Sequence, residues 1–468
     1  MGNSQQSRPR RRSSQPPGGV DHISALPDDL ILLILAGLGC TATAARTSSL
    51  SRRWRGLWAR LGDISLHDVP FQWVADVLSL VARSPPPASS LIEIHLPRER
   101  WPDHEDVASL LRVAARLGPE RLHLEFPETG SSQNPIDVQL PCFHRATLVV
   151  LESLPFVLRV PAAAGGVFAA LRTLLLLDCI VVDKDLAALL SCCPRLRVLV
   201  LRQKATDWLN DHRWIITVHS ETLQELVMDF EKTWVSGVDI VAPVLKQLTL
   251  SFRAYEEASI SISAPMLEKV SWCCHYVPGD IGFGLWTLTR LRLQTAQRQE
   301  ELPSLRIHVS NSSYHFSDEE ASLAEEIEKH MFLDISALEL HLSTMGHVFG
   351  AFVMHLLEMN RVGSVIRRLK IVRQSSQEKE ACLDNCPCEP TDWRTQIISL
   401  TALEELEIYG FQGQDHEYDL LKLILSCAPM LKKMTMKLSR EVSSSNNART
   451  KIFALTAYSS LDCLVFLG

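Results

Sequence analysis

The densest group of side chains that could do chemistry is a trio of cysteines, Cys382, Cys386 and Cys388. Thiolates are good ligands of Zn²⁺, but a structural zinc site needs four ligands at tetrahedral distance. No fourth cysteine or histidine lies close to the trio in the sequence, and His416 or Cys427 would reach it only through folding. The pattern therefore favours free thiols, and we predict no metal and no cofactor.

The common enzyme motifs are absent from the sequence. It contains no glycine-rich phosphate loop, no GxSxG elbow and no HExxH pair. The sixteen histidines are scattered, and none stands near a cysteine or aspartate at the spacing of a triad or metal site. We therefore predict no catalytic residue and a non-catalytic protein.

The placement of the twelve cysteines indicates a reducing compartment. Cys192 and Cys193 are neighbours, as are Cys273 and Cys274, and others lie in apolar runs that read as strands. Such positions suit buried free thiols better than a disulfide framework. We expect the nucleus or the cytoplasm. The alternative, an extracellular repeat receptor, would require oxidised cysteines and a cleaved leader.

Charge and the N-terminal segment exclude several partners. The net charge of −7 gives no reason to expect nucleic-acid binding. Residues 1–20 are rich in Ser, Gln, Pro and Arg and are predicted to be a disordered basic arm, either a nuclear address or a solvated tail. The apolar run at 30–38 is too short to span a bilayer and follows Asp28 and Asp29, unlike a signal peptide, so no membrane is expected.

Three helices are predicted to position the first binding surface. In the first, which begins near Pro27, the apolar residues recur at helical spacing: Leu26, Leu30, Leu33, Ile34 and Leu38. Ile31 and Leu35 lie off that stripe, so this helix must be covered on two sides. Further helices are expected over 42–50 and 51–61, the last with Trp54, Leu57, Trp58 and Leu61 on one face. Domains this small usually need a partner or a staple, unless they merely cap a larger unit.

The segment from Asp21 to Leu61 resembles the F-box of plant F-box/leucine-rich-repeat proteins. The resemblance is carried by Leu26-Pro27-Asp28, the apolar helix to Leu38, Ala45-Arg46-Thr47-Ser48 and Leu50-Ser51-Arg52-Arg53-Trp54-Arg55. Gly39 departs from it, because many members have proline there. The resemblance implies docking onto the Skp-type adaptor of a cullin–RING ubiquitin ligase by a helix-in-groove contact. The predicted adaptor-binding residues are Leu26, Pro27, Leu30, Ile34, Leu50 and Trp54.

A six-residue signature, LxxLxL with other apolar residues allowed, returns along the rest of the chain. Its clear copies begin at Leu91, Leu171, Leu196, Leu223, Leu245, Leu267, Leu288, Ile335, Ile366, Leu403, Leu431 and Leu461, and weaker ones at Leu61, Pro119 and Arg145. Another copy at Leu302 follows Leu288 too closely for a full repeat. The step of about 21 to 31 residues is typical of leucine-rich repeats. The predicted fold class is α/β: a small three-helix F-box followed by a curved solenoid with a parallel sheet on its concave face.

Residues between the signature leucines are predicted to line the concave face. Three late copies carry basic, acidic and again basic side chains. The first two sets are the predicted target-binding residues: Arg367, Arg368 and Lys370, then Glu404, Glu405 and Glu407; the third set is Lys432, Lys433 and Lys437. The rows are expected to be neighbours, either as a ladder of ion pairs between repeats or as a charged docking strip.

Residues 386–438 resemble the FBD module that often ends such proteins. The matching residues include Cys386, Cys388, Trp393, Phe411, Gly413, Glu417 and Leu431-Lys432-Lys433-Met434. The predicted organisation is a basic arm (1–20), an F-box (21–61), a leucine-rich-repeat solenoid (62–380), an FBD module continuing the repeats (381–440), and a loop with a terminal strand (441–468).

Together these patterns predict the substrate-recognition subunit of an SCF-type ubiquitin ligase. The F-box would dock on the adaptor, and through it the cullin–RING ligase, while the repeats hold a target protein whose identity the irregular repeats do not encode. The alternative is a leucine-rich scaffold that binds a partner without directing its modification.

Overall fold

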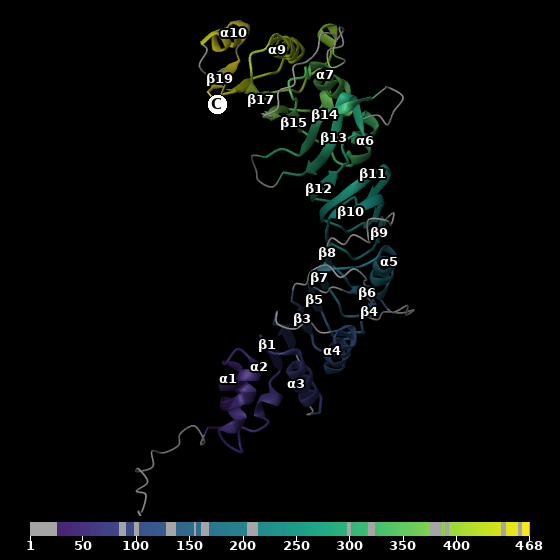
Figure 1. The fold of residues 1–468 in the computed structure, drawn as a ribbon, viewed down its shortest axis with the longest axis vertical. Coiled ribbons are helices and arrows are strands. Elements are labelled where there is room, and N and C mark those ends of the chain that lie inside the picture. The colour runs from purple at the N-terminus through teal and green to yellow at the C-terminus, as the bar shows by residue number, and fades with distance from the viewer. Residues whose placement is uncertain are drawn as a thin grey trace, which may run out of the picture.

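The chain folds into a long, curved molecule with helices at its N-terminal end and stacked repeats beyond them (Figure 1). The computed structural model describes residues 26–83, 90–97, 103–127, 137–153, 156–160, 168–203, 214–296, 301–316, 323–374, 386, 388, 393–440, 446–456 and 461–467. The predicted basic arm and Cys382 lie outside these residues. None of the helices in the described ranges is long and apolar enough to cross a membrane.

The N-terminal helices are shorter than the sequence predicts. Helix α1 covers Asp28–Ala36 and α2 covers Thr41–Arg46, followed by the 3₁₀ turn η1 at Thr47–Ser49. The predicted third helix is wrong: only the 3₁₀ turn η2, Leu57–Arg60, forms there. Gly56, with φ of +89°, precedes that turn in a left-handed conformation that a continuous helix cannot contain. Trp54, Leu57 and Trp58, predicted to share one face, are nevertheless all buried.

Gly39 explains the departure from the family pattern. It has φ of +70° in the turn between α1 and α2, and its N–H donates to the carbonyl of Ala36 at 3.2 Å. This is the left-handed conformation in which many helices end. Proline, whose ring holds φ near −65°, could not take this turn.

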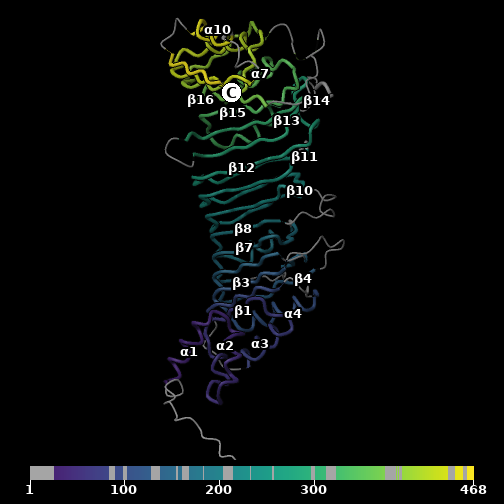
Figure 2. The backbone as a smooth tube through the Cα atoms, turned by 60° about the vertical axis from the view of Figure 1, so that its left-hand side comes forward, coloured from purple at the N-terminus to yellow at the C-terminus, as the bar shows by residue number. Residues whose placement is uncertain are grey.

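A single large sheet of seventeen strands runs through the described part of the chain (Figure 2). Its first strands are β1 (Asp63–His67), β2 (Leu91–His95), β3 (Arg121–Glu125), β5 (Leu148–Glu152), β7 (Thr173–Cys179), β8 (Val198–Gln203), β9 (Trp214–His219), β10 (Glu225–Val241), β11 (Gln247–Ser263) and β12 (Lys269–His275). The later strands are β13 (Gly282–Gln294), β14 (Ser304–Phe316), β15 (Ala337–Ser343), β16 (Arg368–Gln374), β17 (Glu405–Phe411), β18 (Lys433–Leu438) and β19 (Asp462–Phe466). Each predicted LxxLxL copy, strong or weak, coincides with one of these strands.

The signature leucines align from strand to strand. Leu226 on β10 pairs in register with Leu248 on β11, which pairs with Val270 on β12, and all three are buried. Burying one such side chain contributes roughly 1.5–3 kcal/mol. Because each row is buried partly by the rows beside it, no repeat can form its core alone.

One strand runs against the predicted direction. Strand β13, which contains the Leu288 copy, is antiparallel to both β12 and β14, whereas the other pairings in this sheet are parallel. Strand β14 then restores the parallel order with β15. The close spacing of Leu288 and Leu302 has its reason here, since antiparallel strands need only a short connection and parallel strands a long one.

Helices cover the outer side of the curve at both ends of the solenoid, while the sheet lines the inner side (Figure 1). These helices are α3 (Phe71–Arg83), α4 (His104–Leu117), α5 (Asp183–Cys192), α6 (Leu323–His330), α7 (Gly350–Glu358), α8 (Asn360–Gly363), α9 (Asp415–Cys427) and α10 (Asn446–Thr456). A pair of short strands, β4 (Asp137–Gln139) and β6 (Val157–Arg159), lies near α4, and the 3₁₀ turn η4 covers Trp393–Thr395. Between β10 and β12 the predicted helices are replaced by the second halves of β10 and β11, which pair with β9 and with each other.

A buried ion pair joins the C-terminal repeats. The Arg373 guanidinium at the end of β16 contacts the Glu417 carboxylate on α9 at 3.1 Å, and both side chains are buried. Glu417 also accepts the backbone N–H groups of Gln412 and Gln414 at 2.9 and 3.0 Å, which caps α9. Glu417, one of the residues that carry the FBD resemblance, therefore fixes the start of this helix against the preceding repeat.

Replacing Arg373 with methionine should destabilise this joint. The variant leaves the Glu417 carboxylate buried without its counter-charge, which typically costs about 3–5 kcal/mol. Hydrogen exchange followed by mass spectrometry should show a correspondingly lower free energy of opening for α9. The control Arg145→Met removes an exposed pair with Glu120 and should cost less than about 1 kcal/mol. Unchanged protection of α9 in Arg373→Met would contradict this assignment.

Candidate protein-interaction surfaces

The first candidate surface is the outer face of α1 together with Leu50. Ile31 and Leu35 are fully buried within the chain, whereas the opposite face of α1 exposes Leu30, Leu33 and Ile34, and Leu38 is exposed in the turn that follows. Leu33 is 68% exposed and Leu50 is 69% exposed. We call these five residues the apolar face. Large apolar side chains gathered on a surface in this way mark an interaction site.

The structure sorts the predicted adaptor-binding residues into surface and core. Leu30, Ile34, Leu50 and Pro27 are exposed, and Leu26 is partly buried against the core. Trp54 is a correction: only 6% of it is exposed, because its indole packs within the N-terminal domain itself. The prediction missed Leu33 and Leu38, although both belong to the same helical stripe and could have been chosen from it.

An ion-pair network holds the apolar face in place. The Asp28 carboxylate at the start of α1 accepts from the Arg53 guanidinium at 2.8 Å and lies 3.5 Å from that of Arg60. Arg53 also donates to the carbonyl of Leu26. These contacts join the first turn of α1 to the segment that follows α2. The helix that carries the exposed leucines is therefore held in a fixed position.

The second candidate surface is the inner, concave face of the late repeats. The predicted charged rows are neighbours there: Arg368 pairs in register with Glu405, and Glu405 with Lys433. The side chains of Arg368 and Glu405 meet at 2.6 Å. Glu404 bridges Arg367 at 2.9 Å and Lys432 at 3.2 Å. The ladder of ion pairs between repeats is therefore present.

Lys370 departs from that ladder. Its ammonium contacts Glu339 on the preceding strand at 2.9 Å, although Glu407 is its register partner on the following strand. Glu407 instead accepts a hydrogen bond from the hydroxyl of Tyr409 at 3.1 Å.

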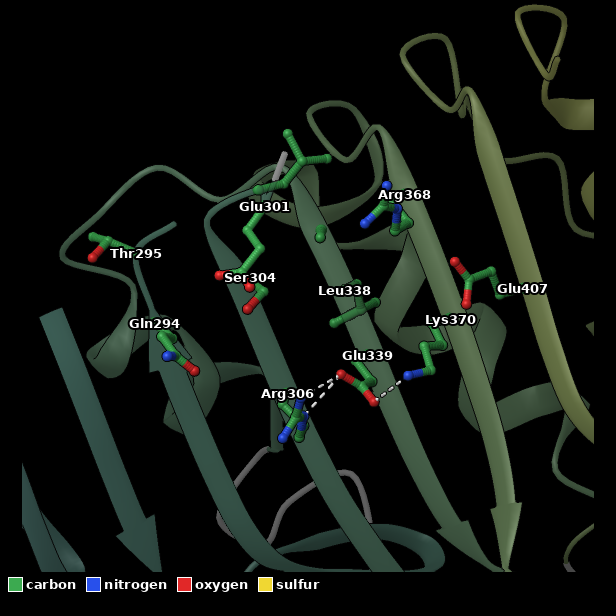
Figure 3. Close-up of a pocket in the computed structure, with 12 residues that line it drawn as sticks. Gln294, Thr295, Glu301, Ser304, Arg306, Leu338, Glu339, Arg368, Lys370 and Glu407 are labelled. Atoms are coloured by element: carbon green, nitrogen blue, oxygen red, sulfur yellow. Dashed lines mark hydrogen bonds and ion pairs between the residues drawn. The ribbon is translucent and has the colours of Figure 1, made fainter. Parts of the chain in front are cut away.

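Glu339 is the centre of a polar pocket on this face (Figure 3). Its two oxygens contact Arg306 at 2.7 Å, Lys370 at 2.9 Å and the imidazole of His341 at 2.8 Å. Burial raises the pKa of Glu339, but the hydrogen bonds and charges of His341, Lys370 and Arg306 outweigh it and hold that pKa well below its usual range. The pocket is about 320 Å³ and is mostly polar, with Ser304, Gln294 and Glu301 on its other sides.

Beside this pocket, basic and imidazole groups accumulate. Arg290 and Arg292 on β13 pair in register with His308 and Arg306 on β14. The rings of His308 and His341 stack at 4.2 Å. Burial, together with the charges of His341 and the nearby arginines, lowers the pKa of His308 to about 4, so its ring is neutral at pH 7.

The early repeats carry a different chemistry on the same face. His67, His95 and His123 follow one another across β1, β2 and β3, with ring centroids 4.6 and 5.0 Å apart. Glu93 and Glu125 lie between them; Glu125 contacts His95 at 2.5 Å and Glu93 contacts it at 3.2 Å. Burial alone would lower the pKa of His95, but its hydrogen bonds to Glu125 and Glu93 raise it.

An apolar band separates the two polar regions. Val150, Leu175, Val200 and Val227 pair in register across β5, β7, β8 and β10, and they lie between the signature positions that form the core. Most of them are half-buried. The inner face thus passes from an imidazole–carboxylate region through an apolar band to an arginine-rich region and the late ion pairs. Such a mixed face suits a protein surface better than a phosphate backbone.

Comparison with known families agrees with this division of the chain. The F-box domain matches residues 23–64, the LRR repeats of FBD-associated F-box protein At5g56370 match residues 107–278, and FBD matches residues 400–436. The chain thus matches an F-box, leucine-rich repeats and an FBD module, the domains for which the F-box/FBD/LRR-repeat proteins are named. The apolar face lies within its F-box, and the concave face is formed by its repeats and its FBD module.

Similar proteins from Arabidopsis thaliana are named for two or all three of these domains. A putative FBD-associated F-box protein is 29% identical over 62% of this chain and 68% of its own length. An F-box/FBD/LRR-repeat protein is 31% identical over 49% of this chain and 55% of its own length. An F-box/LRR-repeat protein is 26% identical over 85% of this chain and 89% of its own length. The first two matches thus span roughly half to two thirds of those relatives.

The Glu339 cluster should give stability a distinctive pH dependence. A carboxylate whose pKa is lower in the folded chain than unfolded, where it is about 4.3, contributes fully above that value and loses its contribution as the pH falls through the folded pKa. The urea midpoint of the wild type should therefore exceed that of Glu339→Gln undiminished down to about pH 5 and converge with it only below about pH 4.5. A difference that already vanishes near neutral pH would contradict the lowered pKa.

Proposed function

We propose that this chain is the substrate-recognition subunit of an SCF-type cullin–RING ubiquitin ligase, with the F-box bound to the Skp-type adaptor. The observation that carries the proposal is the apolar face: an F-box helix buries one side in its own chain and leaves three large apolar side chains exposed on the other, and Leu38 and Leu50 are exposed as well. An exposed face of this kind favours association, because covering it removes apolar area from water.

Leu30, Ile34 and Leu50, with Pro27 beside them, form the adaptor contact in this proposal, and Leu33 and Leu38 extend it. Fully burying one Leu or Ile contributes roughly 1.5–3 kcal/mol, and a few such anchors usually dominate an interface. Leu26 supports the contact from its partly buried position, where Arg53 binds its carbonyl. Trp54 stabilises the domain from within.

The concave face is proposed to hold the target protein. Its polar regions flank an apolar band, so a target can bury apolar side chains in the band and place charged groups on either side. Arg367, Arg368, Lys370, Glu404, Glu405 and Glu407 form the distal, charged part of this surface. The chain itself would be non-catalytic: it would raise the local concentration of target lysines near the conjugating enzyme, and so act through proximity.

A leucine-rich scaffold outside any ligase is the competing function. Both functions use the concave face, but only the ligase subunit requires the apolar face to be covered by adaptor. Co-purification of the adaptor together with cullin therefore distinguishes them, and a chain that binds targets without either subunit would support the scaffold.

The double variant Ile34→Asp, Leu50→Asp should lose adaptor binding. Each aspartate places a charge in an apolar interface and removes one apolar anchor. Because each 1.4 kcal/mol lost weakens binding tenfold, we expect a loss of at least about tenfold. The measurement is the dissociation constant for purified Skp-type adaptor. Both side chains are exposed in the free chain, so circular dichroism should be unchanged.

The matched control is Ile397→Asp. Ile397 is 95% exposed but lies just before the residues that match FBD, 400–436, far along the chain from the apolar face. This variant should bind the adaptor like the wild type. Equal binding by the double variant, or equal loss in the control, would overturn the proposed contact.

Target identity can be approached with the same variant. Proximity labelling under proteasome block should label targets with both the wild type and the adaptor-deficient chain, because the concave face is intact in both. Without proteasome block, targets should be depleted only around the wild type. Targets whose abundance does not depend on the apolar face would favour the scaffold function.

A further inference from the structure

One imidazole and two thiols that could bind a metal ion lie together near the connection between β15 and α7. His347, Cys386 and Cys388 each offer one ligand atom, and these three atoms lie within 4.8 Å of one another. The Sγ of Cys386 is 3.3 Å from Nδ1 of His347. Cys388 is buried, and the other two side chains are half-buried, so the group is sheltered but reachable from solvent.

The histidine is presented by a tight turn. Met345 and Gly346, directly before it, have φ of +47° and +99°, and the His347 N–H donates to the carbonyl of Thr344 at 2.8 Å. Arg373 holds the same turn through the hydroxyl of Thr344 at 3.0 Å. The imidazole is therefore placed by the β15–α7 connection, independently of the cysteines.

An indole five residues after Cys388 packs against the same connection. Trp393 is buried against the first residue of α7, Gly350, where a Cβ atom would lie 2.4 Å from the indole ring. Only glycine admits this approach. Trp393 and η4 therefore lie against the start of α7, the helix that follows the His347 turn.

The geometry fits a divalent zinc ion. Zinc binds thiolate sulfur at about 2.3 Å and imidazole nitrogen at about 2.0–2.1 Å, so neighbouring ligand atoms of a tetrahedral site are about 3.5–3.8 Å apart. The 3.3 Å contact and the 4.8 Å span require only small adjustments to reach these values.

We propose that His347, Cys386 and Cys388 bind one Zn²⁺, with the fourth position filled by a further donor. Binding converts the two thiols to thiolates and releases two protons, while the imidazole coordinates in its neutral form. The ion fastens the segment before the FBD repeats to the preceding connection and acts as a structural staple. The sequence suggested only cysteines as nearby ligands. Folding adds His347, which lies 39 residues before Cys386, as a third named ligand.

The test uses the full-length chain purified from zinc-supplemented medium and passed over a weak chelating resin. Elemental analysis should find about one zinc per chain. Replacing the zinc with Co²⁺ should produce the near-ultraviolet charge-transfer absorption of thiolate-bound cobalt. Cys388→Ser and His347→Ala should each reduce the retained metal at least about tenfold. A wild type that retains no zinc and gives no cobalt–thiolate absorption would overturn the site.

Two further variants separate metal binding from misfolding. His347→Cys supplies another zinc ligand at the same place and should retain metal, while His347→Ala does not. Cys427→Ser removes a half-buried thiol outside the group and should bind metal like the wild type. Equal retention in Cys388→Ser and the wild type, or loss in Cys427→Ser, would contradict the assignment. None of these readouts depends on adaptor binding.

Discussion

The stacking of apolar rows from strand to strand is the constraint on which the rest of the structure depends. Each LxxLxL strand buries its leucines partly against those of its two neighbours, as Leu226, Leu248 and Val270 do. The register that aligns the leucines also aligns the residues between them. Every row of polar groups on the concave face is therefore a consequence of burying the row beneath it. The buried rows therefore determine where the side chains of the concave face lie.

The two ends of the solenoid meet this constraint differently. At the N-terminal end, α1 and α2 pack beside β1, and Ile31 and Leu35 close the core while Leu30 and Ile34 stay outside. At the other end, the buried Arg373–Glu417 pair and the indole of Trp393 lock successive connections together. The N-terminal end leaves apolar side chains exposed, whereas the C-terminal end is made rigid by buried polar and aromatic contacts. This asymmetry supports a receptor that docks at one end and holds its target further along.

Charge on the concave face is organised by competition between neighbouring rows. Glu339 gathers Arg306, Lys370 and His341, and so draws Lys370 away from Glu407. Exposed pairs such as Arg367–Glu404 contribute little to stability because water screens them, so their larger effect is to balance charge along the face. A target meeting it encounters paired charges beside an apolar band.

Much of this architecture was determined by the sequence alone. The recurring leucines predicted the strands of the large sheet other than β9, because burial repeats with a period that can be read along the chain, and they missed β4 and β6. The F-box and FBD resemblances are confirmed by the family comparisons. The direction of a strand, the conformation of a turn and the partner of a side chain could not be predicted in this way. The reversal of β13, the turn at Gly56, the inward position of Trp54, the choice of Glu339 by Lys370 and the approach of His347 to Cys386 all depend on which groups meet across long sequence separations. Only the tertiary structure decides those meetings, because their energies arise from contacts that no local pattern contains.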